Sequence, residues 1–233
     1  MSPSNRDIHK QLKEAQKVDS IGKILKFYSC SDECKGFCCE VFDIDIDIIE
    51  VEEVIKISKR VKNTLLNNIK QIGQEVTYLD TYRLTTKPCP FLRNAKCSIY
   101  NKRPIPCKIY PFRFHKEALT NYVCIDPCPM GVNIIFDWCI WSISKAVLSN
   151  VESDVVNEII VENMKAMLLA LKTVNMFKRR VVEALFNSNR QYFSVDSLLL
   201  DEFTQYLALV PEKRRIESRE NVLRENELFH QYL

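Results

Sequence analysis

The sequence predicts a mainly α-helical fold with an irregular cysteine- and proline-rich region and small β-hairpins, so that the α+β character is minor. The first observation is that seven of the nine prolines lie between Pro88 and Pro129. Each proline removes a backbone donor and fixes φ, which argues against long helices there. The second is hydrophobic spacing of helical period on both sides of this region.

Composition divides the chain into three expected segments. Residues 1–26 form a helical N-terminal segment, residues 27–131 hold nine of the ten cysteines, and residues 132–233 form a helical C-terminal region. The last boundary is placed near Gly131, where cysteine and proline give way to apolar residues at helical spacing.

A short strand followed by a helix is expected between the first cysteines and the proline-rich stretch. Ile44, Ile46 and Ile48 alternate with acidic residues, as in a half-buried strand. The apolar stripe that follows has helical spacing and stops at Gly73; it consists of Val51, Val54, Ile55, Val61, Leu65, Ile69 and Ile72.

The C-terminal region is expected to be helical from about residue 133 onward. Cys139 lies in the apolar stretch IIFDWCIWSI, where a free thiol most simply packs in the core. Ser153 or Asp154 is a candidate N-cap for the next helix, and further helices are expected over 177–187, 195–209 and 212–231. The apolar face of that next helix comprises Val156, Ile159, Ile160, Met164, Met167, Leu168 and Leu171.

Composition also indicates the cellular compartment of the protein and the chemical role of its thiols. The 233 residues are 46% hydrophobic, so a core can form without disulfides. The polar N-terminus lacks the apolar region of a secretory signal, and no run of about 18 apolar residues suggests a membrane partner. We therefore expect a cytoplasmic protein, in which a cysteine cluster binds metal or acts in catalysis.

Several common motifs are excluded by spacing. Cys30, Cys34 and Cys38 are four residues apart, which is one residue too long at the second gap for the CxxxCxxC loop of radical enzymes. Zinc knuckles use CxxC pairs, and the sequence contains none. Only four glycines occur and none are clustered, which excludes a nucleotide-binding glycine loop.

Two stretches carry a resemblance to a known family. They are CSDECKGFCC at 30–39 and PCPFLRNAKCSIYNKRPIPCKIYP at 88–111. Together they resemble the YkgJ-type cysteine-cluster family, named for a CxxCxxCC zinc- or iron-chelating domain that also occurs in flagellin lysine N-methylase. The resemblance covers roughly residues 27–131. It departs from the family in the wider spacing of the first motif and at Lys108, where arginine is common.

The resemblance implies a metal centre, with an iron–sulfur cluster, [4Fe–4S], favoured and zinc as the alternative. Cys124 is an additional candidate ligand, and eight thiols exceed the needs of one four-ligand centre. Either two centres exist or some thiols are structural. The ligands that the family pattern implies are Cys30, Cys34, Cys38, Cys39, Cys89, Cys97, Cys107 and Cys128.

Physical chemistry supports the metal interpretation independently. Thiolates are soft ligands that suit zinc and iron–sulfur clusters. Gly36 allows the loop to turn tightly towards an ion. Adjacent Cys38 and Cys39 would point in opposite directions if the backbone were extended, and could then serve different centres.

The charge pattern adds a second feature. From Thr81 to Lys116 there are nine basic residues and no acidic one. This stretch could be a solvated basic face, a nucleic-acid surface, or a set of cations that compensates an anionic metal–thiolate centre. Arg103 is the preferred candidate for a hydrogen-bond donor near the metal or for binding an anionic group. Lys108 and Tyr100 are further candidates for the same roles.

These features are compatible with several functions. The first hypothesis is a cytoplasmic iron–sulfur protein that supports modification or maturation of a protein partner. The alternatives are a non-catalytic interaction module stabilised by zinc or a cluster, and an electron-transfer or metal-handling protein. Nucleic acid is a weaker candidate partner, and no catalytic residue can be assigned.

Overall fold

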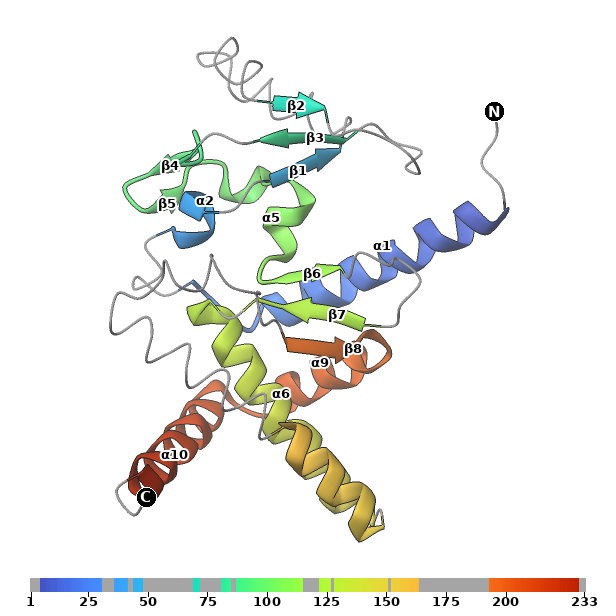
Figure 1. Ribbon diagram of the computed structural model, residues 1–233, viewed down its shortest axis with the longest axis vertical. Coiled ribbons are helices and arrows are strands. Elements are labelled where there is room, and N and C mark those ends of the chain that lie inside the picture. Colours follow the sequence, from blue (N-terminus) through green and yellow to red (C-terminus); the bar gives the residue numbers. More distant parts are fainter. Residues whose placement is uncertain are drawn as a thin grey trace. The chain divides into compact units, whose positions relative to one another are not determined.

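We analysed a computed structural model of the chain, which describes residues 5–30, 36–41, 44–47, 69–71, 81–84, 87–114, 122–126, 128–150, 152–163 and 193–230. The fold is mainly helical with small antiparallel sheets (Figure 1). It divides into two compact units. Unit 1 comprises residues 1–30 and 111–233, and unit 2 comprises residues 31–110.

The helices of unit 1 include three long ones. These are α1 (Asn5–Leu25), α6 (Pro129–Leu148) and α10 (Glu212–His230). A shorter helix, α9 (Leu200–Leu209), follows the 3-10 turn η3 (Ser197–Leu199), and residues 153–163 are also helical. The sequence predicts these segments because each, except the polar α10, carries apolar residues at helical spacing.

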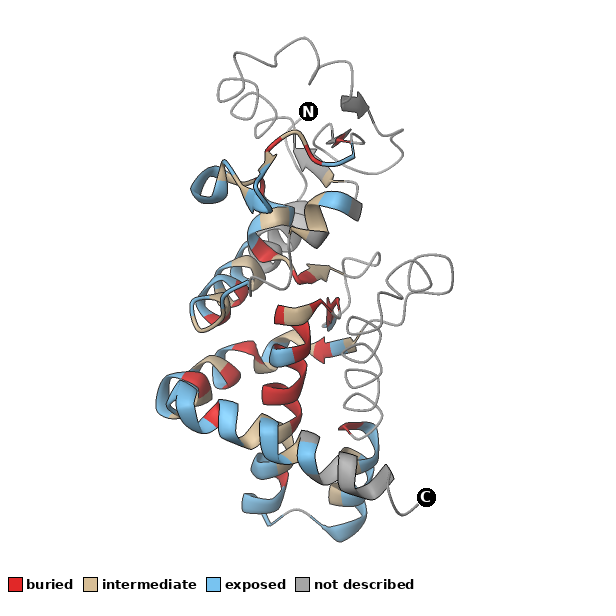
Figure 2. Ribbon diagram, turned by 90° about the vertical axis from the view of Figure 1, so that its left-hand side faces the viewer, coloured by how far each residue is buried: buried red, intermediate tan, exposed pale blue. Residues whose placement is uncertain are grey.

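Helix α6 is the centre of the unit 1 core. Most of its residues up to Trp141 are buried (Figure 2). Trp138 and Trp141 pack against Phe203 of α9, with ring centroids 4.9 and 5.4 Å away. Ile21 and Ile24 of α1 are fully buried, and Ser20 donates to Asp201 of α9 at 2.8 Å. The core therefore joins α1, α6 and α9 around aromatic side chains.

A three-stranded antiparallel sheet completes unit 1. Its order is β6 (Phe112–Phe114), β7 (Tyr122–Ile125), β8 (Phe193–Asp196). Val123 of β7 is paired with Val195 of β8, and both are buried. This sheet joins residues 112–114 and 122–125 to residues 193–196, so the two compact units have other bounds than the three segments expected from composition.

Unit 2 is built of short elements. Helix α2 (Phe37–Val41) precedes a sheet of order β1 (Ile44–Asp47), β3 (Thr81–Leu84), β2 (Ile69–Gln71). A two-stranded hairpin of β4 (Leu92–Arg93) and β5 (Lys96–Cys97) follows. The 3-10 turn η2 (Tyr100–Lys102) and helix α5 (Ile105–Ile109) close the unit. Short, irregular elements are what the proline density predicts.

Two helix predictions need correction. The stripe expected to be helical up to Ile72 contains strand β2 at its end, because Ile69 pairs with Leu84 of β3. The helix expected from residue 195 begins at Leu200, because Val195 lies buried in β8. Asp196 then accepts a hydrogen bond from the backbone N–H of Leu198 at 2.9 Å, and this turn separates strand from helix.

The remaining predictions of helices and of one strand are either confirmed or fall outside the described residues. Helices are confirmed over 5–25, 153–163 and 212–230, the last ending one residue before the expected bound. The strand expected at Ile44 is confirmed as β1. The predicted helices over 164–171 and 177–187, and the stripe over 51–68, lie outside the described residues.

One helix among the described residues is long and apolar enough to cross a membrane by length and composition alone. This helix is α6, with a mean hydropathy of 1.3 in its most apolar window. Of that window, 56% is buried inside the structure. The burial fits a core helix, and its sequence contains an acidic residue, Asp137, that the core must accommodate.

Candidate metal centre

Four of the predicted ligand cysteines come together in unit 2, each from a different element. Cys39 lies on α2, Cys89 precedes the β4–β5 hairpin, Cys97 ends that hairpin, and Cys107 lies in α5. Cys89 is buried in a small apolar cluster with Leu84 and Phe91; Cys39 and Cys97 pack against that cluster together with Ile44 and Ile99.

Helix α2 presents two adjacent thiols from a tight turn. Gly36 has a φ of +77°, which side chains other than glycine adopt with strain. Its carbonyl accepts from the N–H of Cys39 at 2.8 Å. The Sγ atoms of Cys38 and Cys39 lie 4.0 Å apart. The backbone is helical here and not extended, so the two thiols do not point in opposite directions.

Backbone hydrogen bonds tie these thiol-bearing segments to one another. The N–H of Cys89 donates to the carbonyl of Cys39 at 2.8 Å, which links the hairpin entry to α2. The carbonyl of Phe91 accepts from the N–H of Ser98 at 2.8 Å and from its hydroxyl at 2.9 Å. The positions of Cys39, Cys89 and Cys97 are therefore fixed by main-chain bonds as well as by packing.

The thiols are close enough to perturb one another. A hydrogen bond with Cys38 raises the pKa of Cys39 to about 12, with burial adding to the shift. A hydrogen bond with Cys39, followed by burial, also raises the pKa of Cys89. Burial, followed by the charges of Cys89, Cys39 and Cys97, raises the pKa of Cys107 to about 12. Four thiols thus share one electrostatic environment.

Arg103 is the cation that acts on Cys97 and Cys107, and Lys87 acts on Cys89. The charge of Arg103 opposes the burial that raises the pKa values of Cys97 and Cys107. The guanidinium lies 3.7 Å from the centroid of the Tyr100 ring, and its Nε donates to the Tyr100 carbonyl at 2.9 Å. Lys108 lies exposed on α5. Arg103 and Tyr100, both named from the sequence as candidates beside the site, are thus in contact with each other.

The donor set fits a thiolate-bound metal by its chemistry. Soft thiol sulfur is the ligand type of zinc and of iron–sulfur clusters. Within the ranges that the structure describes, no three His, Cys, Asp or Glu side chains converge closely enough to hold an ion as they stand. Binding would therefore require the thiols of unit 2 to draw closer together and to lose protons.

Three further candidate ligands, Cys30, Cys124 and Cys128, belong to unit 1. Cys34 is outside the described residues. Cys30 is exposed in unit 1, five residues beyond the end of α1. Cys128 is buried at the N-cap of α6, where its Sγ accepts from the N–H of Gly131 at 3.3 Å. Cys124 is buried in β7, with its Sγ 3.9 Å from the hydroxyl oxygen of Ser194.

The geometry around Cys128 gives this thiol a structural task in addition to its predicted ligand role. A Cβ on Gly131 would lie 2.0 Å from the carbonyl oxygen of Asp126, so the first turn of α6 approaches that backbone very closely. Cys139 lies fully buried in α6, and its thiol donates to the Asn163 carbonyl at 3.7 Å. A core location for Cys139 agrees with its apolar sequence context.

Sequence reasoning missed a polar cluster in unit 1. The Asp137 carboxylate, 1% exposed, accepts hydrogen bonds from Tyr28, Arg215 and Arg219. The available signal was a single acidic residue within the apolar stretch IIFDWCIWSI. A buried carboxylate requires partners, but their identity depends on the tertiary structure.

Comparison with known proteins gives one match. Residues 29–128 match the sequence model of a domain family, CxxCxxCC, described as a "putative zinc- or iron-chelating domain". This range contains every cysteine of the chain except Cys139. Neither the curated proteins nor the solved structures contain a significant match.

Proposed function

We propose that the chain binds a metal through its cysteine-rich region and that this metal centre is an iron–sulfur cluster of the [4Fe–4S] type. The match of residues 29–128 to the CxxCxxCC model, described as a "putative zinc- or iron-chelating domain", supports the metal-binding part of the proposal. The observation that carries this proposal is the shared environment of Cys39, Cys89, Cys97 and Cys107. Four thiols are the ligand number of such a cluster. When bound, the cluster would supply one-electron redox chemistry.

The chain's own residues would hold the cluster in a partly apolar setting. Leu84 and Phe91 would shield one side of the cluster from water, because both are buried together with Cys89. Arg103 would offset the negative charge of a thiolate-bound cluster, since its cation already favours the thiolate forms of Cys97 and Cys107. Zinc is the alternative occupant, since the same thiols suit it.

The metal is tested by purification without oxygen. The protein should be brown and contain iron and acid-labile sulfide in comparable amounts. Colourless protein with stoichiometric zinc and no sulfide would overturn the iron–sulfur proposal and retain the metal-binding function. Protein that retained neither metal would contradict both.

The role proposed for the centre is support of the modification or maturation of a protein partner in the cytoplasm. Unit 2 offers a surface that suits an acidic partner. Its exposed cations Arg93, Lys96, Lys102 and Lys108 form no ion pair within the described chain. Arg93 and Lys96 even lie directly opposite each other in the β4–β5 hairpin, where like charges repel.

The partner proposal can be tested with acidic probes. A labelled oligoglutamate peptide should bind the metal-loaded protein with an affinity that falls as salt rises. Reversal of both hairpin charges, Arg93→Glu with Lys96→Glu, should abolish binding. Reversal of Lys213 and Arg214 on α10 is the matched control and should leave binding unchanged. Binding of an oligothymidylate in place of the peptide would favour a nucleic-acid partner.

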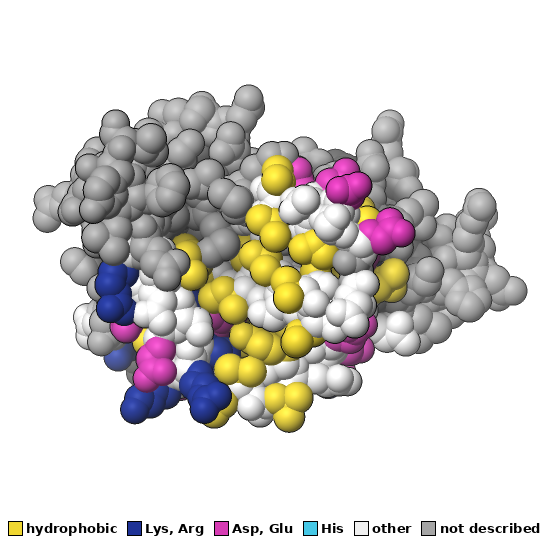
Figure 3. Space-filling model, turned by 90° about the horizontal axis from the view of Figure 1, so that it is seen from below, with side chains coloured by type: hydrophobic (Ala, Val, Ile, Leu, Met, Phe, Trp, Pro, Cys, Tyr) yellow, Lys and Arg dark blue, Asp and Glu magenta, His cyan; other side chains and the backbone are white. Residues whose placement is uncertain are grey.

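A second candidate function is a metal-stabilised interaction module without turnover. Exposed large hydrophobic side chains in unit 1 favour it, and Figure 3 shows hydrophobic side chains gathered on the face seen from below. The most exposed are Leu148 at 82% and Leu209 at 81%. Capture of a stable partner whose covalent structure stays unchanged after incubation would favour this function over the first.

A further inference from the structure

Two of the four thiols in unit 2 are carried by backbone segments that are bonded directly to each other. The N–H of Cys89 donates to the Cys39 carbonyl at 2.8 Å. With standard bond lengths on either side of that hydrogen bond, the two Cα atoms cannot be more than about 6.7 Å apart. Disulfides usually span Cα separations of roughly 4.4–6.8 Å. The backbone therefore places Cys39 and Cys89 within reach of a direct S–S bond.

The side chains of this pair lie in the same apolar setting. Cys89 is buried in the cluster with Leu84 and Phe91, and Cys39 packs against that cluster. The two thiols also interact with each other, and each affects the pKa of the other. Among the described residues no three metal-ligating side chains converge on one point, but a disulfide needs only two. Packing as well as backbone geometry thus favours this pair.

Cys38 is the competing partner for Cys39, since their Sγ atoms lie 4.0 Å apart. Consecutive Cα atoms are only about 3.8 Å apart, which is below the usual range for a disulfide. Helix α2 also holds both residues in one turn, where the N–H groups of Cys39 and Glu40 donate to the Gly36 carbonyl at 2.8 and 3.2 Å. A bond between the two neighbours would have to distort that turn, so Cys89 is the favoured partner.

Resting on the proposed metal-binding function, we propose that Cys39 and Cys89 form a reversible disulfide when the metal-free protein meets a hydroperoxide, and that this bond closes the metal site. The bond would take two of the four thiols that the candidate centre groups together. Metal and disulfide are then alternative states of the same residues. A dithiol reductant would return both thiols and reopen the site.

The reaction balances with one molecule of peroxide for the pair of thiols. The half-buried Cys39 sulfur attacks the peroxide, the O–O bond breaks, and the sulfur becomes a sulfenic acid while one water leaves. The Cys89 sulfur then attacks the Cys39 sulfur. The S–O bond breaks, the S–S bond forms, and the departing hydroxide takes the Cys89 proton to leave as a second water. Because the thiolate is the reacting form and the pKa of Cys39 is raised to about 12, we expect slow oxidation near neutral pH.

The experiment maps the bond in the full-length protein. Protein is purified without oxygen, its metal is removed with a chelator, and hydrogen peroxide is added. The remaining thiols are blocked with N-ethylmaleimide before tryptic digestion and mass spectrometry. We expect a cross-link between peptides 36–56 and 84–93, which contain Cys39 and Cys89. Fragmentation between the adjacent cysteines of the first peptide assigns the bond in the parent protein itself, so the assignment does not depend on how well a variant folds.

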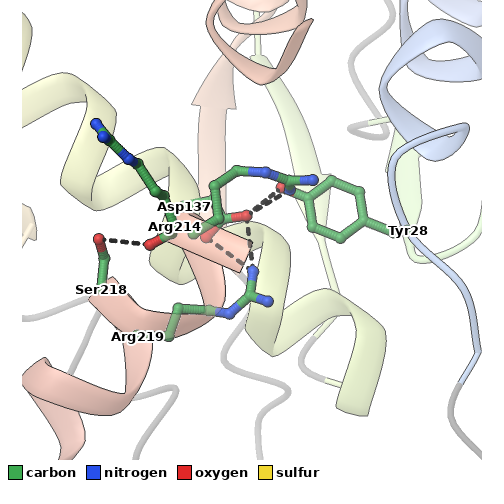
Figure 4. A network of polar contacts seen from close by, with 6 residues as sticks. Tyr28, Asp137, Arg214, Ser218 and Arg219 are labelled. Atoms are coloured by element: carbon green, nitrogen blue, oxygen red, sulfur yellow. Dashed lines mark hydrogen bonds and ion pairs between the residues drawn. The ribbon is translucent and has the colours of Figure 1, made fainter. Parts of the chain in front are cut away.

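Three variants serve as controls for the cross-link. Cys39→Ser should lose it, whereas Cys38→Ser, which changes the neighbouring residue of the same peptide, should retain it. Tyr28→Phe is the control for general destabilisation in unit 1. It removes a hydrogen bond to the buried Asp137 carboxylate (Figure 4) and should form the cross-link at the parent rate.

Zinc uptake links the disulfide to the metal site. Reduced metal-free protein and peroxide-treated protein are compared by equilibrium dialysis against Zn²⁺. The oxidised protein should bind about one ion fewer per chain, because a four-thiolate site has lost two of its ligands. Dithiothreitol should abolish the cross-link and restore the missing ion.

The outcomes distinguish the inference from the function on which it rests. A bond between Cys38 and Cys39, a bond from Cys89 to another thiol, or no bond at all would overturn the inference, while zinc binding by the reduced protein would still support the proposed function. If the reduced protein bound no metal but formed the expected cross-link, the proposed function would fail, and with it the coupling of the disulfide to metal. Equal zinc binding before and after cross-linking would also refute that coupling. The expected cross-link together with reversible loss of zinc would support the inference.

Discussion

The Sγ atoms of Cys38 and Cys39 lie 4.0 Å apart on one turn of α2, yet the two thiols face different surroundings. Cys39 packs against the apolar cluster of Cys89, and the charges of Cys38 and Cys97 raise its pKa further. Cys38 is not a member of that cluster. The two neighbours are therefore expected to contribute unequally to a metal centre.

Serine replacements test the ligand set. Cys39→Ser and Cys107→Ser should lower bound metal sharply, because both thiols interact with Cys89 and Cys97. The same loss is expected for Cys34→Ser, and a smaller one for Cys38→Ser. Cys139→Ser is the matched control, since a serine hydroxyl can also donate to the Asn163 carbonyl that the thiol contacts. The amount of metal bound per protein molecule is measured after purification. The assignment would be refuted if the Cys139→Ser variant had lost its metal while the Cys39→Ser variant had retained it.

Gly36→Ala should destabilise unit 2 by about 1–2 kcal/mol, because φ at this position is +77° and an added Cβ would lie 2.5 Å from Cδ1 of Leu92. Leu92 belongs to the hairpin that carries Cys97, so metal retention should fall as well. Gly22→Ala is the opposite control. It lies within α1 with nothing within 4 Å of an added Cβ, and should stabilise by about 0.5–1 kcal/mol. Urea unfolding of both variants measures the difference.

Arg103 should influence the centre through its charge and its position. Arg103→Ala removes the cation that favours the thiolates of Cys97 and Cys107, so metal binding should weaken about 10-fold. Arg103→Lys retains the charge and should recover part of the affinity. Competition with a chromogenic chelator measures both. Equal affinities for the parent and Arg103→Ala would show that the cation does not act on the centre.

The Tyr28 hydroxyl should make stability depend on pH in the alkaline range. Burial, followed by the charge of Asp137, raises the pKa of Tyr28 well above its ordinary value of 10.0. Because the folded state favours the neutral phenol, this contribution is complete below about pH 10 and is lost as pH rises towards the folded pKa. The loss is at most about 1.4 kcal/mol per pH unit.

Urea unfolding of the parent and of Tyr28→Phe between pH 8 and 11 isolates this effect, since other groups titrate in both proteins. The stability advantage of the parent over Tyr28→Phe should shrink above pH 10. A constant difference across the range would mean that Tyr28 ionises equally easily in both states.

Removal of the metal should disorder residues 87–110 more than the rest of the described chain. The elements there are short, namely a hairpin of two-residue strands, a 3-10 turn and a five-residue helix, whereas β7 carries Val123 and Ile125 in the core of unit 1. Hydrogen exchange on metal-free protein measures this. The amides of α6 should stay protected, and equal protection of both regions would contradict the expectation.

The sequence predicted the parts of the fold that depend on local pattern. Helical spacing located the helix at 153–163 and most of α9, and the alternation around Ile44 located β1. The sequence did not predict the strands whose formation depends on the strand with which they pair. Ile69 fits a helical stripe, but Leu84 lies opposite it in β3, and Val195 is drawn into a sheet by Val123 of β7. Such contacts depend on residues distant in sequence.

Prediction of the candidate site was similarly divided. Cysteine spacing and the family resemblance named the thiols as candidate ligands, and the basic stretch named Arg103 as a candidate partner of the centre. The grouping of Cys39, Cys89, Cys97 and Cys107 required the structure, because four separate short elements bring them together. Asp137 could be noticed as a lone acid, but its arginine partners lie 78 and 82 residues further along the chain.

The buried carboxylate of α6 has a consequence for biosynthesis. The segment 129–148 is as long and apolar as many membrane anchors, and insertion machinery at a membrane samples such segments as they emerge from the ribosome. A carboxylate near the middle of the segment adds about 2.5–3.5 kcal/mol to the cost of transfer into lipid. Asp137 would thus bias the nascent chain towards water before Arg215 and Arg219 have even been synthesised.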